Sequence, residues 1–190
     1  MKTKSFSLVE LLVTVAILTI IGSILIAFVR NTYTLYYRGQ YLSLTKTEAD
    51  TLTTRIANAL RGTYQVVSAD ASQITVLSYF APADATPTQV TITKTGANIT
   101  LSTIIGVASG STYTYDPGTA TTRTINTHFV TNPATPLFQY ESEMGTLNLP
   151  ISLPAVHLVT VSSTIFSTYN STYTTTSSTK VNLRNLKTNL

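Results

Sequence analysis

The feature that most constrains this chain is an uncharged, mostly apolar run from Leu11 to Val29, directly preceded by the carboxylate of Glu10. A membrane-spanning helix needs about 20 apolar residues, whereas the apolar core of a secretory signal has only about 7–15. A carboxylate inside such a segment is unfavourable by roughly 2.5–3.5 kcal/mol at the helix centre and by less near its end. No cation lies within the run. We therefore expect the partner of Glu10 to belong to another molecule or to a new terminus made by cleavage.

The residues in front of the apolar run carry a specific signature. Lys2 and Lys4 precede the small residue Ser5, and the chain then continues from Phe6 as Phe-Ser-Leu-Val-Glu-Leu-Leu. This opening resembles the class III signal of type IV prepilins and pseudopilins. The resemblance covers residues 1–30 and requires the basic leader, the cut site, the glutamate and the apolar run to coincide.

The resemblance implies how the chain is processed and assembled. In that family a prepilin peptidase cuts after the small residue and methylates the new N-terminal amine. Here the cut would fall between Ser5 and Phe6, with Phe6 N-methylated and Glu10 as the fifth residue of the mature protein. The family role of that glutamate is to pair with the N-terminal amine of a neighbouring subunit. The family residue before the cut is usually glycine, so Ser5 departs from the pattern while keeping a small side chain.

A plain signal-anchor is the alternative interpretation of the same run. It explains the apolar residues and the flanking lysines, but it gives no role to Glu10. Under this interpretation the chain is a single-pass, membrane-anchored surface adhesin or binding protein that does not polymerise.

The helical pattern continues beyond the apolar run. Apolar residues recur every seven positions and fill an alternate seam, at Leu35, Leu42, Ala49, Leu52, Ile56 and Ala59. Gly62 follows Leu60-Arg61 and is predicted to cap the helix. We predict one helix from Phe6 to Arg61, about 80 Å long at 1.5 Å per residue. Its half at 6–30 should lie in lipid or in a filament core, and its half at 31–61 should pack on the chain's own sheet.

The composition of the remaining chain favours β-structure. Only 11% of the residues are charged, against about 25% in an average soluble protein. Thr, Val, Ile and Tyr, which favour strands, fill the sequence instead. We predict an α+β fold in which the long helix carries an antiparallel, β-rich head domain at 62–190, and the resemblance implies the pilin fold. Cysteine is absent, so disulfides and thiolate metal sites are impossible.

Short β-rich runs bounded by turn residues predict the strands of the head domain. They are Tyr64–Ala69, Gln73–Phe80, Gln89–Lys94, Asn98–Thr103, Thr124–Val130, Leu137–Glu141, Ala155–Ser162 and Lys180–Asn185. Thr95-Gly96-Ala97 predicts a tight hairpin turn. Loops are predicted at Gly106–Gly118 and at Ser167–Thr179, the latter because it contains only Ser, Thr, Tyr and Asn.

Short phrases of the head domain resemble the W/J-type minor pilins and pseudopilins. They are Leu60-Arg61-Gly62, Leu137-Phe138-Gln139-Tyr140, the strand at His157–Val161, and the closing Val181-Asn182-Leu183-Arg184-Asn185-Leu186. Major pilins commonly carry a proline in the apolar half of the helix, but no proline precedes Pro82 here. Both observations favour a minor pilin or pseudopilin over a major subunit.

The titratable residues of the head domain give no catalytic pattern. His128 and His157 lack a second ligand at metal-binding spacing, and Asp70, Asp84 and Asp116 are expected in turns. Glu141 and Glu143 are expected to be solvated beside a turn. No nucleophile, phosphate-binding or zinc motif occurs, so we predict no enzyme, no metal and no cofactor.

The net charge is +4, or +2 once Lys2 and Lys4 are removed with the leader. No Lys/Arg cluster with interleaved aromatic residues occurs, so the charge gives little support for nucleic-acid binding.

Four tyrosines cluster where the helix should leave the bilayer, at Tyr33, Tyr36, Tyr37 and Tyr41. They are interpreted as anchors at the membrane interface or, alternatively, as contacts between subunits.

These observations predict a structural subunit of a type IV pilus-like filament. The expected partners are other pilin subunits, the prepilin peptidase and a membrane assembly platform. The chain would cross the cytoplasmic membrane once before assembly and lie in an extracytoplasmic fibre afterwards. Pilus, type II secretion and DNA-uptake systems share the same signal, so all three remain open.

Overall fold

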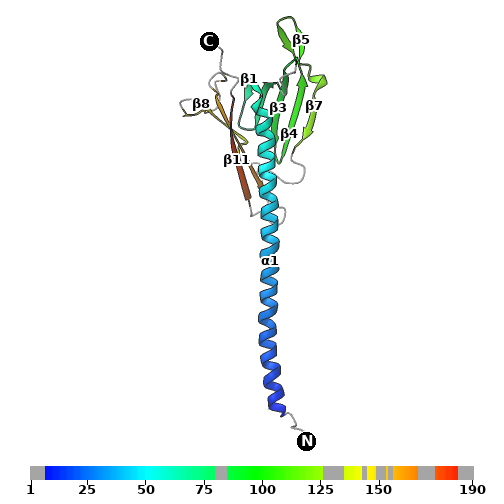
Figure 1. Cartoon of the computed structure of the whole chain (residues 1–190), viewed down its shortest axis with the longest axis vertical. Coiled ribbons are helices and arrows are strands. Elements are labelled where there is room, and N and C mark those ends of the chain that lie inside the picture. The colour runs from blue at the N-terminus through cyan, green and yellow to red at the C-terminus, as the bar shows by residue number, and fades with distance from the viewer. Residues whose placement is uncertain are drawn as a thin grey trace. The chain divides into compact units, whose positions relative to one another are not determined.

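The computed structural model describes residues 7–79, 85–125, 135–142, 145–148, 153, 156–166 and 174–183. These residues form the predicted α+β architecture, with one long N-terminal helix followed by antiparallel β-sheets, an arrangement consistent with the pilin fold (Figure 1). Residues 1–41 and 42–190 form two compact units.

The helix α1 runs from Leu8 to Arg61 and contains 54 residues. Its end at Arg61 confirms the predicted C-terminus, whereas the predicted start at Phe6 lies outside the described residues. The part in the second unit carries the buried face: Thr45, Ala49, Leu52, Thr53, Ile56, Ala57, Ala59 and Leu60. The predicted apolar stripe is therefore correct from Ala49 onward. Leu35, which lies in the first unit, is 65% exposed.

The described strands are short and antiparallel. They are β1 (Thr63–Ala69), β2 (Gln73–Ser78), β3 (Thr88–Thr95), β4 (Asn98–Ile105), β5 (Val107–Ser109), β6 (Thr112–Thr114), β7 (Thr121–Thr124), β8 (Phe138–Ser142), β9 (Gly145–Thr146), β10 (Leu158–Phe166) and β11 (Thr174–Asn182). One sheet has the order β1-β2-β3-β4-β7, a second has the order β11-β10-β8-β9, and β5 pairs with β6. A short 3-10 helix, η1 (Pro117–Thr119), precedes β7.

The core of the second unit lies between α1 and the two larger sheets. In the five-stranded sheet, Ile74, Ile92 and Leu101 lie side by side on β2, β3 and β4 because the register pairs them directly. In the four-stranded sheet, Tyr140 of β8 is paired with Val159 of β10, and both are buried. Burying a Leu, Ile or Val side chain fully contributes about 1.5–3 kcal/mol relative to exposure. These inward rows therefore supply most of the stability of the unit.

Buried hydroxyl groups join the helix to the second sheet. Thr53 Oγ1 of α1 lies 2.6 Å from Ser163 Oγ of β10, and Ser163 Oγ also donates to the carbonyl oxygen of Ala49 at 3.0 Å. A buried hydroxyl without a partner is unfavourable by about 1–3 kcal/mol. The mutual bonds remove that penalty and specify how β10 packs on α1.

The tight hairpin at Thr95-Gly96-Ala97 is confirmed. It joins β3 to β4, and Gly96 adopts a φ of 59°, which suits glycine.

Two predicted loops were wrong in part. Gly106–Gly118 contains the β5–β6 hairpin, which turns at Gly110 with a φ of 64°. Within Ser167–Thr179, residues 174–179 belong to β11, and 167–173 lie outside the described residues.

Two further differences concern the strand before residue 126 and the helix cap. The strand predicted at Thr124–Val130 overlaps β7 only at Thr124, since β7 begins at Thr121 and pairs with β4, and residues 126–130 lie outside the described residues. Gly62 does follow the last helical residue, but its φ is not positive, so it is not a left-handed cap. A Cβ at Gly62 would lie 2.5 Å from the carbonyl oxygen of Tyr79. Close packing against the chain after β2 therefore explains this glycine.

Candidate functional site

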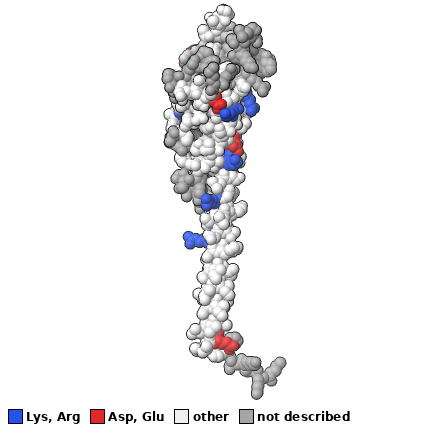
Figure 2. Space-filling model, turned by 90° about the vertical axis from the view of Figure 1, so that its left-hand side faces the viewer, with Lys and Arg blue, Asp and Glu red and all other residues white. Residues whose placement is uncertain are grey.

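The first part of α1 presents a continuous apolar surface. The large apolar side chains between Leu8 and Val29 are 49–80% exposed, and an 18-residue window of the helix has a mean hydropathy of 2.8. By length and composition this helix can cross a membrane. Figure 2 shows a long stretch of the helix without charged side chains on the face in view.

The hydroxyl side chains of this region are satisfied within the helix. Thr14, Thr19, Ser23, Thr32 and Thr34 each donate to a backbone carbonyl three or four residues earlier, at 2.7–2.9 Å. Such bonds let a hydroxyl group enter an apolar medium without losing its hydrogen bond. The polar residues that follow Glu10 in the apolar run are therefore compatible with lipid or with helix–helix packing.

Glu10 lies in the first turn of α1. The backbone N–H groups of Glu10 and Leu11 donate to the carbonyl oxygen of Ser7 at 3.0 and 3.1 Å. A carboxylate in the first turn is favoured by the helix dipole, typically by about 0.3–1 kcal/mol. Among the described residues, its carboxylate has neither a hydrogen bond nor an ion pair. Ser5 and Phe6, the predicted cleavage residues, lie outside the described residues.

The tyrosines after the apolar run contact one another along one side of the helix. The rings of Tyr33 and Tyr37 stack at a centroid distance of 6.5 Å, and those of Tyr36 and Tyr37 meet edge-on at 5.7 Å. Tyr33, Tyr36 and Tyr37 are exposed, and Tyr41 is half-buried. The cluster combines apolar ring surface with exposed hydroxyl ends, which suits either of the two interpretations of these residues.

Two of the predicted turn aspartates have turn geometry. Asp70 Oδ1 accepts from the N–H of Ala71 at 2.6 Å, and Asp116 Oδ1 accepts from the N–H of Gly118 at 2.9 Å at the start of η1. Asp84, His128 and Glu143 lie outside the described residues. In the part of the chain that is described, no group of three or more His, Cys, Asp or Glu side chains could hold a metal ion.

Glu141 is not simply solvated, as the sequence had suggested. It lies in β8, and its carboxylate accepts from Lys180 Nζ at 2.9 and 3.1 Å and from Thr160 Oγ1 at 3.2 Å. The hydrogen bond with Lys180 lowers the pKa of Glu141. His157, directly before β10, donates its backbone N–H to the carbonyl oxygen of Glu141 at 3.1 Å. These contacts tie β8, β10 and β11 together.

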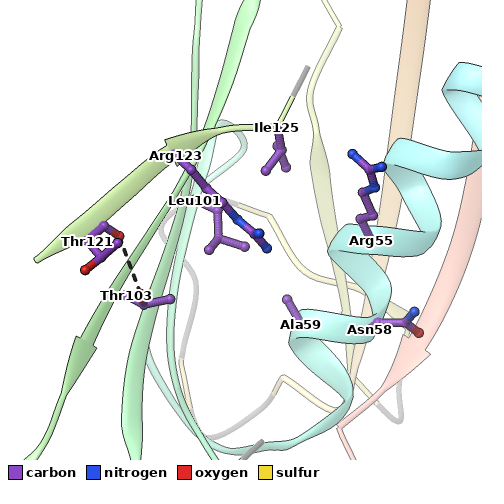
Figure 3. A pocket seen from close by; sticks show the side chains of 8 residues that line it. All are labelled: Arg55, Asn58, Ala59, Leu101, Thr103, Thr121, Arg123 and Ile125. Carbon is purple, nitrogen blue, oxygen red and sulfur yellow. Dashed lines mark hydrogen bonds between the residues drawn. The ribbon is translucent and has the colours of Figure 1, made fainter. Parts of the chain in front are cut away.

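Sequence reasoning missed a cavity in the second unit. It has a volume of about 480 Å³ and is lined by Arg55, Asn58 and Ala59 of α1, Leu101 and Thr103 of β4, Thr121 and Arg123 of β7, and Ile125 (Figure 3). No local sequence signal marks the cavity, because Arg55 and Arg123 are 68 positions apart in the sequence (123 − 55) and line the same cavity only in the folded unit.

No family model matches the chain, and neither a curated protein nor a solved structure matches it significantly.

Proposed function

We propose that the chain is a structural subunit of a type IV pilus-like filament. It enters the membrane as a prepilin, is cleaved between Ser5 and Phe6 and N-methylated on Phe6, and is then assembled into an extracytoplasmic fibre. The observation that carries the proposal is the continuity of α1. One helix joins an exposed apolar segment, with Glu10 in its first turn, to the residues that form the core of a β-rich unit.

Two properties of the apolar segment support this role. Its exposed side chains are apolar, and its hydroxyl groups are hydrogen-bonded to backbone carbonyls of the same helix. In lipid it spans the membrane, and in a fibre the same side chains bury against the corresponding helices of other subunits. Removal of apolar surface from water contributes about 25 cal/mol per Å², which favours the packed state once the helix leaves lipid. A helix serving only as an anchor would need no core-forming continuation from Ala49 to Leu60.

The carboxylate of Glu10 supports a specific register in the fibre. In an apolar setting, a carboxylate left without a counter-charge is unfavourable by several kcal/mol, and so is an isolated ammonium group. Both penalties are relieved when Glu10 meets the N-terminal amine of Phe6 on a neighbouring subunit. The apolar helices therefore supply contact area, while the charge pair selects the axial alignment.

The role is structural and not enzymatic, and its partners are other pilin subunits, the prepilin peptidase and a membrane assembly platform. We assign the chain to the minor pilins or pseudopilins. The W/J-like phrases support this assignment, as does α1, which continues through the apolar segment without a proline. A fibre of this kind would serve adhesion, motility, secretion or DNA uptake.

Mass spectrometry of the mature N-terminus tests the proposal. The expected N-terminal peptide begins at an N-methylated Phe6. A Ser5→Gly variant should be cleaved at least as completely, whereas Ser5→Leu should block the cut because the small side chain is lost. An intact Met1, or a cut beyond Ala27, would instead support the non-polymerising surface adhesin.

A further inference from the structure

Polar residues of the edge strand β7 line the cavity beside α1, although every residue of β7 is exposed. The register places Arg123 opposite Leu101, which is itself paired with Ile92 and thereby continues the buried row that begins at Ile74. An apolar side chain would be expected at the position of Arg123. Thr121 follows the same pattern, because it pairs with Thr103 on the same face. The edge of the sheet is therefore not filled by apolar side chains against the helix.

Two guanidinium groups line this cavity from opposite walls. Figure 3 shows Arg123 extending from β7 toward the helix, with Arg55 projecting from α1 on the other side. Neither guanidinium group has a hydrogen bond or an ion pair with any described residue. Among the described residues that line the cavity there is no Asp or Glu to compensate the positive charge.

The floor of the cavity is apolar and has the size of a small-molecule site. Ala59, Leu101 and Ile125 are all buried and contribute the apolar lining. Ligand pockets commonly have volumes of about 300–1,000 Å³ and combine an apolar lining with a few polar groups that orient the ligand. Guanidinium groups recognise carboxylates through paired N–H donors, and bonds between charged groups are the stronger ones.

We propose that this cavity binds an organic carboxylate with a compact apolar body. The carboxylate lies between Arg55 and Arg123, and the apolar body contacts Ala59, Leu101 and Ile125. Such a group has two possible sources, a free small molecule or an acidic residue of a neighbouring polypeptide. A simpler role for Arg123 is to guard the sheet edge, since inward-pointing charges discourage edge-to-edge pairing. Edge protection, however, does not explain why Arg55 also lines the cavity.

Calorimetric titration of the full chain in dodecyl maltoside with benzoate tests the proposal. Saturable binding of benzoate is expected, and uncharged benzamide should bind at least tenfold more weakly. Arg55→Gln and Arg123→Gln should each weaken benzoate binding about tenfold, while Arg123→Lys retains part of it. Lys46→Gln, which removes an exposed cation of α1 outside the cavity, should leave binding unchanged. Each variant is first checked for an unchanged thermal midpoint.

Benzoate binding that is absent, or that both arginine variants leave unchanged, would overturn the proposal and leave edge protection as the role of Arg123. Because the titration uses the purified chain, its result does not depend on whether the chain assembles into filaments. The source of the carboxylate is distinguished in cells. If a free molecule supplies it, the arginine variants assemble normally; if a neighbouring subunit supplies it, they enter filaments less often than Lys46→Gln.

Discussion

Gly62 stands where α1 ends and β1 begins, and its lack of a side chain allows two backbone segments to approach closely. The N–H of Tyr79 donates to the carbonyl oxygen of Gly62 at 3.3 Å. A Cβ at Gly62 would lie 2.5 Å from the carbonyl oxygen of Tyr79 and 2.6 Å from Ser78 Oγ. Such distances force the backbone after β2 to move, so the constraint at Gly62 is steric and does not come from its φ.

Gly62→Ala should destabilise the second unit by about 1–3 kcal/mol, the usual range for a side chain forced into packed surroundings. The thermal midpoint of the full chain in dodecyl maltoside measures this effect. Gly39→Ala is the matched control, because no atom lies within 4 Å of a Cβ there, and alanine favours the helix by about 1 kcal/mol. Equal midpoints for Gly62→Ala and the unmodified chain would contradict the steric explanation.

Residue-level predictions from the sequence succeeded where the determinant is local. Gly96 provides the positive φ that its hairpin turn needs. The side chain of Asp116 accepts a hydrogen bond from the backbone two residues later. Arg123 has no such local signature. Its inward position follows from pairing with Leu101, 22 residues earlier (123 − 101), so only the register of the folded sheet reveals it.

Among the elements, β11 shows how strand pairing overrides composition. Residues 174–179 of β11 fall in the predicted Ser- and Thr-rich loop, and Lys180–Asn182 fall in the strand predicted at Lys180–Asn185, yet all nine residues pair with β10. Cross-strand hydroxyl pairs satisfy this polar face, with 3.0 Å between Ser162 Oγ and Ser178 Oγ and the same distance between Thr164 Oγ1 and Thr176 Oγ1. Threonine has a high preference for strands, and the preference prevails here because a partner strand is present.

The ion pair between Glu141 and Lys180 gives this sheet a dependence on pH. Because the pKa of Glu141 is lowered in the folded state, its contribution to stability is complete above the pKa of an unfolded glutamate. The contribution is lost as the pH falls through the lower, folded pKa. Lys180→Gln should therefore reduce the loss of thermal midpoint between pH 6 and pH 3, compared with the unmodified chain.

Lys46→Gln serves as the control for this pH comparison, since Lys46 is exposed and forms no ion pair with a described residue. It should leave the acid-induced loss of thermal midpoint unchanged. If Lys180→Gln and the unmodified chain lose the same number of degrees, the ion pair contributes nothing to the pH dependence.

For the whole molecule, the sequence predicted the order of elements better than the packing between them. The apolar run and the seven-residue spacing of Ala49 and Ile56 predicted the long helix, and Gly62 predicted its end at Arg61. The Thr, Val, Ile and Tyr content of the remaining chain then predicted the α+β fold. Where burial begins on that helix was not predictable, because it depends on how far the sheets reach along α1. The cavity between Arg55 and Arg123 depends on the same tertiary arrangement.

The proposed filament makes Glu10 the residue on which assembly depends. Glu10→Gln keeps the size of the side chain and removes its charge, so the membrane-spanning character of the helix is preserved. The amine of Phe6 on the neighbouring subunit would then be buried without a counter-charge, which typically destabilises by about 3–5 kcal/mol. Since 1.4 kcal/mol corresponds to a factor of ten, incorporation into filaments should fall at least tenfold at equal amounts of membrane-inserted subunit.

Glu48→Gln provides the matched control for Glu10→Gln. It removes one carboxylate from the same helix, at a half-buried position beyond the apolar segment, and should assemble like the unmodified subunit. Filaments sheared from cells and probed for the subunit, with the membrane fraction probed in parallel, separate failed assembly from failed insertion. Incorporation of Glu10→Gln at the level of Glu48→Gln would mean that apolar contact alone aligns the subunits. The carboxylate in the first turn of α1 would then need another explanation.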